Sequence, residues 1–100
     1  MKKYTKQWKI LWKGRQIVVK NWWDLLLRGR EELLIDGETV DQYENWFLFS
    51  RDLETKIFVN GKEHQIRAHL GSVDFGFRMG CKIFIDNQLV GGDMHKKFIT

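Results

Sequence analysis

The residues of this chain best suited to metal binding or covalent catalysis are two histidines and one cysteine, His64, His69 and Cys81. The histidines are five positions apart, and an odd spacing places them on opposite faces of a strand, so they cannot bind one ion together unless a bulge intervenes. Cys81 lies within an apolar alternation, where a thiol is typically a small core residue. The spacing of these residues therefore predicts no metal site.

A cysteine nucleophile also needs a nearby base and a group that orients the base. Asp74 and one of the histidines could supply these groups for Cys81, but the sequence around Cys81 matches no known nucleophile signature. The glycines between Gly71 and Gly80 do not form the motif of a phosphate-binding loop. We therefore expect no catalytic residue and no cofactor, and an enzyme is only the third hypothesis.

Basic and aromatic residues are interleaved near the N-terminus, a mixture typical of surfaces that bind single-stranded nucleic acid. The candidate interaction surface consists of Lys9, Lys13, Arg15, Lys20 and Trp22. In contrast, the alternation of Trp8, Ile10 and Trp12 favours a place in the core for these residues. If Trp22 and Trp23 lie on a strand, only one of them can point inward, which leaves the other as a contact for a partner.

Charge is distributed unevenly along the chain, which has a formal net charge of +4. Residues 1–30 contain nine Lys and Arg and a single acid, whereas residues 31–60 contain two bases and eight acids. One interpretation is that basic and acidic strands are neighbours, because opposite charges across a ladder are mildly stabilising. The other is a two-signed surface that binds a protein partner, or a second copy, by charge complementarity.

Four turn signals between runs of alternating apolar residues predict a fold built from β-hairpins. They are Lys13-Gly14, Asp36-Gly37, Asn60-Gly61 and Asp86-Asn87. Gly, Asn and Asp suit such turns because they tolerate positive φ. The even spacing of the turns predicts an all-β fold, an antiparallel β-sandwich or flattened barrel of about six to eight strands. The third and fourth hairpins look alike, which we interpret as convergence on a good hairpin sequence.

The longest apolar alternation runs from Val73 to Ile85 and predicts one strand, or two strands joined by a kink or bulge at Gly80. Its apolar face, with Phe77 and Ile83, is the expected core. Residues 21–29 and 38–46 could instead be helical, which would make the fold α+β.

A length of 100 residues predicts one domain, with residues 1–5 and 93–100 as frayed tails. The single cysteine cannot form an internal disulfide, and the basic N-terminus lacks the apolar run of a secretion signal. The apolar stretches are also much shorter than a membrane span. We therefore expect a cytoplasmic protein that does not bind membranes.

The order of these features resembles the Fas apoptotic inhibitory molecule family, small all-β proteins of the animal cytosol. The similar elements are Trp8-Lys9-Ile10-Leu11, Lys13-Gly14, Ile35-Asp36-Gly37, Phe75-Gly76-Phe77 and Ile83-Phe84-Ile85-Asp86-Asn87. The resemblance extends from Trp8 to about Val90. It implies a β-sandwich with a non-enzymatic role in protein interaction, and it implies no cofactor and no catalytic residue.

The leading hypothesis from the sequence is a small, cytosolic, non-catalytic β-sandwich that binds a protein partner or forms a homodimer. The alternative is a binder of single-stranded nucleic acid or another anionic ligand, which would use the basic, Trp-rich N-terminal region.

Overall fold

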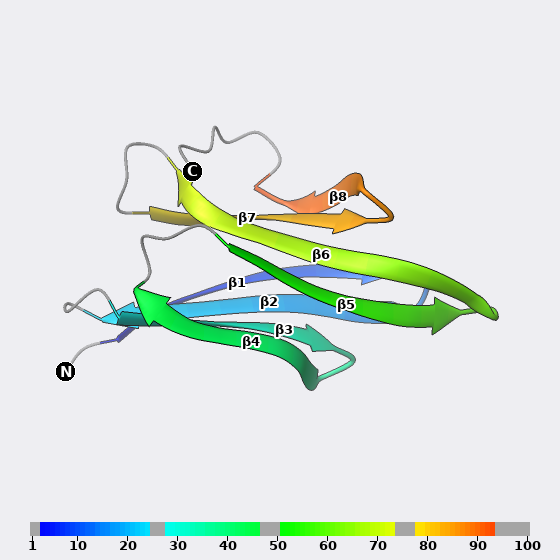
Figure 1. The fold of residues 1–100 in the computed structure, drawn as a ribbon, viewed down its shortest axis with the longest axis horizontal. Helices are drawn as coiled ribbons and strands as arrows, with labels where there is room; N and C mark the ends of the chain where they lie inside the picture. The colour runs from blue at the N-terminus through cyan, green and yellow to red at the C-terminus, as the bar shows by residue number, and fades with distance from the viewer. Residues whose placement is uncertain (1–2, 25–27, 47–50, 74–77, 94–100) are drawn as a thin grey trace.

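The computed structural model describes residues 3–24, 28–46, 51–73 and 78–93, and this part of the chain forms eight β-strands and no helix (Figure 1). The strands are β1 (Lys3–Trp12), β2 (Arg15–Asp24), β3 (Arg28–Ile35), β4 (Glu38–Trp46), β5 (Arg51–Val59), β6 (Lys62–Val73), β7 (Arg78–Ile85) and β8 (Gln88–Gly92). Strands β1 to β4 form one antiparallel sheet, which we call sheet A, and β5 to β8 form sheet B. The predicted all-β, antiparallel, sandwich-like fold is confirmed.

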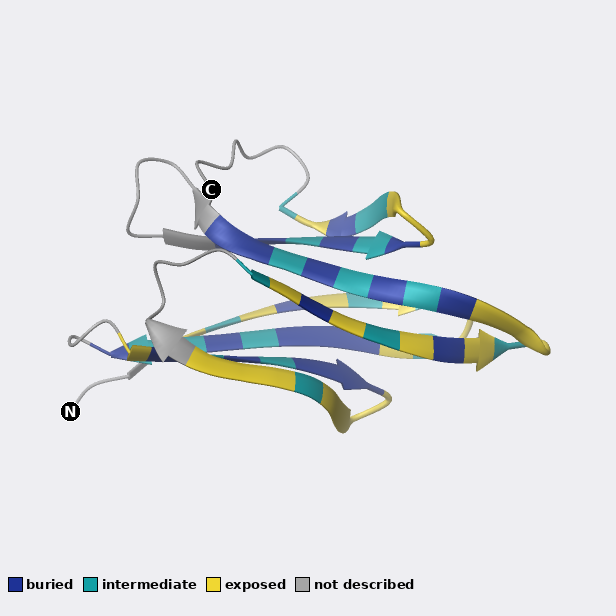
Figure 2. Cartoon of the chain, in the orientation of Figure 1, coloured by how far each residue is buried: buried dark blue, intermediate teal, exposed yellow. Residues whose placement is uncertain are grey.

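The two sheets face each other, and their inward side chains form the hydrophobic core (Figure 2). The core residues are Trp8, Ile17, Val19, Leu33, Ile35, Leu53, Ile57, Ile66, Ala68, Leu70, Cys81, Ile83 and Ile85. On the strands that supply them, β1 to β3 and β5 to β7, these residues are at alternate positions, as the pleat of a sheet requires. Ile83 is buried as predicted, whereas Phe77 lies outside the described residues. Strand β4 differs from the others, because its described side chains are exposed along most of its length.

All four predicted turns are confirmed as two-residue connections between consecutive strands. Both central residues have positive φ in every one of them, for example 47° and 78° at Lys13 and Gly14, and 50° and 66° at Asp86 and Asn87. Positive φ at both positions is the signature of the type I′ turn, whose twist matches that of the flanking strands. The turn dipeptides therefore determine where each hairpin begins and ends.

One prediction about an individual segment was wrong, and one alternative that the sequence left open is excluded. The alternation from Val73 to Ile85 is not one continuous strand, because β6 ends at Val73, β7 begins at Arg78, and these two residues are antiparallel partners. Helices at 21–29 and 38–46 are also excluded where the structure describes these residues, which lie in β2, β3 and β4. Strand β1 begins at Lys3, so part of the segment expected as an N-terminal tail is paired with β2.

The two sheets repeat the same local construction. In sheet A the register shifts between Leu33 and Leu34, two residues before the β3–β4 turn, and in sheet B it shifts between Ile83 and Phe84, two residues before the β7–β8 turn. The aspartate that opens each of these turns then makes the same contacts. The N–H of Asp36 donates to Gln16 O at 2.8 Å and its Oδ1 accepts from the N–H of Gln16 at 2.8 Å.

Asp86 and Gln65 make the equivalent pair of hydrogen bonds in sheet B, at 2.9 and 3.0 Å. The second hairpin of the chain therefore corresponds to the fourth. The likeness between the third and fourth hairpins, which the sequence suggested, relates two neighbouring segments of the same sheet, β5–β6 and β7–β8.

Two aspartates connect the sheets along their edges, where β1 lies beside β8 and β4 beside β5. Asp93 Oδ2 accepts hydrogen bonds from Trp8 Nε1 at 2.9 Å and from the N–H of Cys81 at 3.0 Å. On the other side, Asp41 Oδ2 accepts from the N–H of Glu54 at 2.9 Å. These contacts fix how the two sheets are stacked.

Gly92 is expected to tolerate substitution much less than Gly14 does. Its φ is +88°, and an added Cβ would overlap the carbonyl oxygen of Cys81 on the neighbouring strand. Gly14 has a similar φ of +78°, but an added Cβ there meets nothing within 4 Å. Gly14→Ala should therefore cost only the left-handed backbone penalty, about 1–2 kcal/mol, and Gly92→Ala should cost clearly more. Urea unfolding of both variants measures the difference, and equal losses would contradict the close contact.

Candidate functional site

Three residues of the predicted interaction surface lie together on the outer face of sheet A. Lys9 is exposed on β1, whereas Lys20 and Trp22 are half-buried on β2, two positions apart and therefore on the same face. Leu11, two positions from Lys9 on β1, is the most exposed large hydrophobic residue described, at 77%. We call these four residues the basic face.

Lys13 and Arg15 lie elsewhere, at the turn end of the molecule. The Lys13 ammonium is 5.0 Å from the centre of the Trp12 ring. The Arg15 guanidinium binds Asp36 at 2.5 Å and the carbonyl oxygen of Phe58 at 3.2 Å, so it links the two sheets. The N–H of Gln16 and the Arg15 side chain both hold the pKa of Asp36 below its ordinary value. The five predicted residues therefore do not form one continuous patch.

Most of the described tryptophan side chains belong to the interior. Trp8 is buried, and Trp12 and Trp23 pack against the core. Trp22 points the other way, so the prediction that only one of the neighbouring pair faces inward is confirmed. The basic face consequently has one tryptophan, not a row of aromatic rings on which successive bases could stack.

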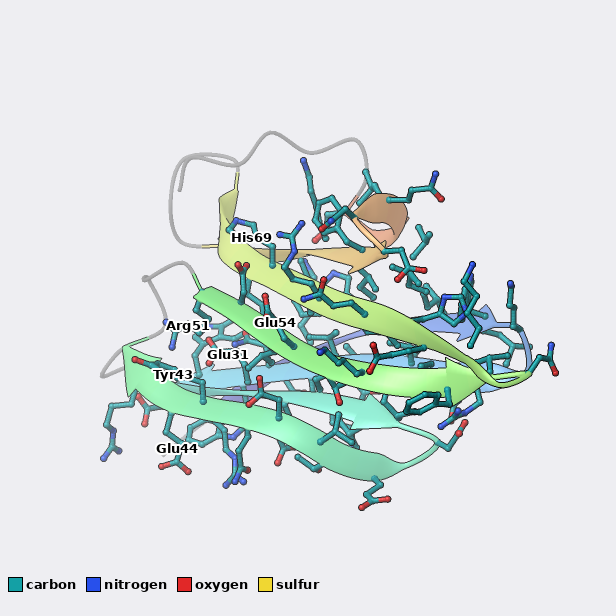
Figure 3. The ribbon with its side chains drawn as sticks, turned by 45° about the vertical axis from the view of Figure 1, so that its right-hand side comes forward. Glu31, Tyr43, Glu44, Arg51, Glu54 and His69 are labelled. Atoms are coloured by element: carbon teal, nitrogen blue, oxygen red, sulfur yellow. The ribbon has the colours of Figure 1, made fainter. Side chains whose placement is uncertain are left out.

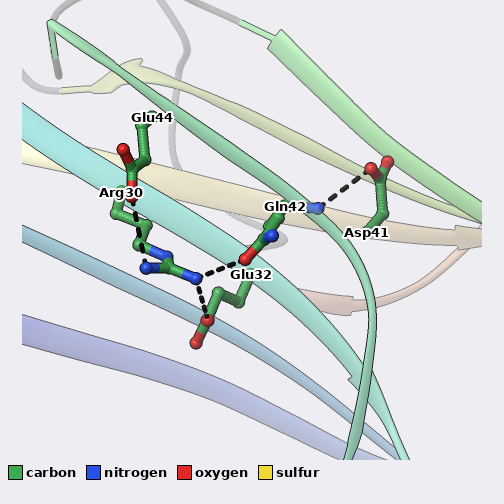
Figure 4. Close-up of polar contacts among 5 residues, drawn as sticks. All are labelled: Arg30, Glu32, Asp41, Gln42 and Glu44. Carbon is green, nitrogen blue, oxygen red and sulfur yellow. Dashed lines mark hydrogen bonds and ion pairs between the residues drawn. The ribbon is translucent and has the colours of Figure 1, made fainter.

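Acidic residues lie on β3 and β4, where two of them contact Arg30 (Figure 4). Arg30 binds Glu32 at 3.1 Å and Glu44 at 3.2 Å, and it also donates to the side chain of Gln42. Glu32 is in turn the register partner of Lys20. The outer face of sheet A thus changes from basic on β1 and β2 to mixed and acid-rich on β3 and β4. Basic β2 and mixed β3 are neighbours, whereas β1 and β4 lie at opposite edges of the sheet.

The interior holds a polar cluster that sequence reasoning missed. Glu31 is fully buried on β3, where its Oε1 accepts a hydrogen bond of 3.4 Å from Asn21 Nδ2 and its Oε2 lies 3.4 Å from Arg51. The Arg51 guanidinium, at the start of β5, also lies 4.5 Å from the ring centre of Tyr43. Figure 3 shows Glu31, Tyr43 and Arg51 close together where sheets A and B meet.

Burial raises the pKa of Glu31 to about 7, and the positive charge of Arg51 opposes that rise. A group with this pKa exchanges its proton near neutral pH, which is the behaviour required of a pH-responsive carboxyl group. The sequence does carry a signal for it, because Glu31 has the same alternation parity as Leu33 and Ile35. A charged residue at an inward position is the feature that would have identified this cluster.

The histidines and the cysteine occupy separate environments, as their spacing predicted. His64 is buried and its Nδ1 lies 2.6 Å from Asp86, whereas His69 is on the outer face of sheet B with its Nδ1 2.8 Å from Asp52. Cys81 is buried, and burial raises its thiol pKa so that the thiol stays protonated. Among the described residues, no three His, Cys, Asp or Glu side chains are grouped so that they could hold a metal ion.

In the described ranges, no helix is long and apolar enough to cross a lipid bilayer. Comparisons with models of protein families, with curated proteins and with solved structures found no match to this chain. The resemblance to the Fas apoptotic inhibitory molecule family therefore stays a prediction, and a functional proposal has to start from the residues of the chain itself.

Proposed function

We propose that this protein is a non-catalytic β-sandwich of the cytoplasm that binds an acidic surface of a protein partner through its basic face. The observation that carries this proposal is the placement of Lys9, Lys20 and Trp22 on one face of sheet A. Leu11, which is 77% exposed, extends the same face toward the turn end of β1. An exposed aliphatic side chain with a half-buried tryptophan supplies apolar contact area, and the lysines supply charge complementarity.

A protein partner fits this face better than a single-stranded nucleic acid does. Nucleic acid binding requires a groove of clustered positive charge that follows the phosphates, together with exposed aromatic rings. Here Glu32 lies beside Lys20, and Arg30 is bound by Glu32 and Glu44. A face that changes sign over the width of one sheet repels part of a polyanion, but it can match a folded protein surface of mixed charge.

Site-specific photocrosslinking tests the proposal. With a photoreactive amino acid in place of Leu11, the full chain expressed in cells should form discrete protein adducts, because a bound partner would cover this position. The substitutions K9E and K20E should abolish these adducts. The matched control pair K56E and K62E changes two exposed lysines of sheet B and should leave the adducts unchanged.

The same photoreactive group in place of Phe58, an exposed residue of sheet B at 64%, controls for random collision. Identical adduct patterns from both positions would contradict a specific partner surface. Titration with a labelled oligodeoxythymidine should show no binding at physiological salt. Micromolar binding whose log K falls with log salt by about 0.7 per phosphate contact would replace the proposal with nucleic acid binding.

A further inference from the structure

Sheet A has two long edge strands, β1 and β4, and both leave apolar side chains exposed. Of the large hydrophobic residues exposed in the described part of the chain, Leu11 is on β1, Val40 and Tyr43 are on β4, and only Phe58 is elsewhere. Edge strands present unpaired backbone groups that can receive another strand. A strand that pairs with either edge must match both its backbone groups and its charges.

The charges of the two edge strands are opposite and equally spaced. Strand β1 has lysines at positions 3, 6 and 9 and no acid, whereas β4 has acids at positions 38, 41 and 44 and no base. Pairing two β1 edges, or two β4 edges, would place like charges opposite each other, which is destabilising. Pairing β1 of one copy with β4 of another places opposite charges together.

The hydrogen-bonding direction of β1 follows from its turn. In a hairpin with a two-residue turn, the residues flanking the turn exchange both backbone hydrogen bonds, and the pairs then alternate. Trp12 and Arg15 flank this turn, so the even-numbered residues of β1 bond to β2. The backbone groups of the odd-numbered residues, including Lys3 and Thr5, therefore point to the free edge.

The same alternation can be followed across the sheet to β4. The hydrogen bond from the N–H of Asp36 to Gln16 O shows that the even-numbered residues of β2 bond to β3. The odd-numbered residues of β3 then bond to β4, where their partners include Asp41 and Tyr43. Gln42 and Glu44 consequently direct their backbone groups to the free edge of β4, where the N–H of Gln42 donates to Asp41 Oδ1 at 2.9 Å.

One antiparallel register satisfies all of these conditions. With Thr5 opposite Gln42, outward-directed backbone groups meet, and side chains of the outer face meet side chains of the outer face. The N–H of Gln42 then exchanges its hydrogen bond to Asp41 Oδ1 for one to the added strand. The same register places the position of Lys3 opposite Glu44 and that of Lys6 opposite Asp41. A shift by one residue would place inward-directed backbone groups at the new contact, and it would also place outer-face side chains opposite inner-face side chains.

We infer that β1 of one copy pairs antiparallel with β4 of a second copy, in the register with Thr5 opposite Gln42. This inference rests on the proposed function, because it names a second copy as the partner received on the basic side of sheet A. A sheet with an even number of strands continues its antiparallel alternation when the next copy is added by translation. Such a heterologous contact does not close, so it forms open chains of molecules.

Disulfide trapping tests the register. In the variant T5C/Q42C, oxidation should produce a ladder of dimers and larger species. The two cysteines of one chain cannot join, because three strand spacings separate them by about 14 Å and a disulfide spans at most about 7 Å between Cα atoms. The control variant T5C/E63C carries its second cysteine at an exposed position of sheet B and should form no ladder.

Charge exchange tests the complementarity independently. The variants K3E/K9E and E38K/E44K should each self-associate about tenfold more weakly than the wild type in sedimentation experiments at low salt, because opposite charges become like charges. An equimolar mixture of the two should regain association. A second copy is excluded as the occupant if T5C/Q42C forms no more ladder than T5C/E63C.

The two proposals fail in different ways. A protein that stays monomeric, with no ladder, but still forms Leu11 adducts with other proteins contradicts only the pairing of copies. Loss of both the ladder and the Leu11 adducts contradicts the partner surface as well.

Discussion

Replacing Leu33 with alanine is expected to lower the free energy of unfolding by about 2–5 kcal/mol, as measured by urea denaturation. Leu33 is fully buried on β3, in the core between the sheets. Alanine removes its apolar contacts and leaves a cavity that the surrounding strands fill only in part. A domain of this size has about 5–15 kcal/mol in total, so this single change removes a large share of the stability.

The matched control is Leu11→Ala, because Leu11 is also on a strand of sheet A but is 77% exposed. Its loss should stay within about 0.5 kcal/mol. If Leu33→Ala does not fold, Ile83→Val tests the same core with an expected loss of about 0.5–1.5 kcal/mol. Equal losses for Leu33→Ala and Leu11→Ala would show that sheet A buries the opposite face.

The stability of the protein should decrease as the pH rises from about 4.5 to 7, because of Glu31. Its pKa is 4.5 as a free side chain and about 7 in the folded protein. Over this interval the folded state keeps a proton that the unfolded chain has lost, so the free energy of unfolding falls with pH. The contribution is fully present below pH 4.5, lost above pH 7, and amounts to about 3 kcal/mol.

Glu31→Gln removes this dependence while it keeps the shape of the side chain. The unfolding free energy of E31Q minus that of the wild type should therefore increase by about 3 kcal/mol between pH 4.5 and 7.5. Taking the difference removes the contributions of ionisable groups that both proteins share. Glu44→Gln is the control, because the Glu44 side chain is 70% exposed. Parallel stability curves for E31Q and the wild type would refute a raised pKa.

The turns and the fold class could be predicted from the sequence because they depend on neighbouring residues. Positive φ at Lys13-Gly14 and Asp86-Asn87 is a local property, and period-2 alternation identifies a strand wherever it is placed. Between Val73 and Ile85 the same alternation led to a wrong prediction of one continuous strand. It continues across the boundary between β6 and β7, and a periodic pattern contains no information about the direction of the chain.

The interior cluster could not be predicted because its members come from different sheets. Glu31 and Arg51 are brought together by the stacking of sheet A on sheet B, which no local pattern specifies. The sequence predicted only part of the interaction surface, because pairing between strands also decides which of its residues lie together. Lys9, Lys20 and Trp22 share a face through the β1–β2 register, whereas Arg15, close to them in sequence, is drawn to Asp36 at the end of the sheet.

The order of the strands also determines how the chain folds. Every ladder in the two sheets joins strands that are consecutive in the sequence, so each strand pairing closes a short loop. Short loops cost little chain entropy, and isolated hairpins form within about 1–10 μs. Neither sheet can bury its apolar face before the other is present. We therefore expect the docking of the two sheets to be the slow step, and we expect this β-protein to fold faster than Greek-key sandwiches with long-range ladders.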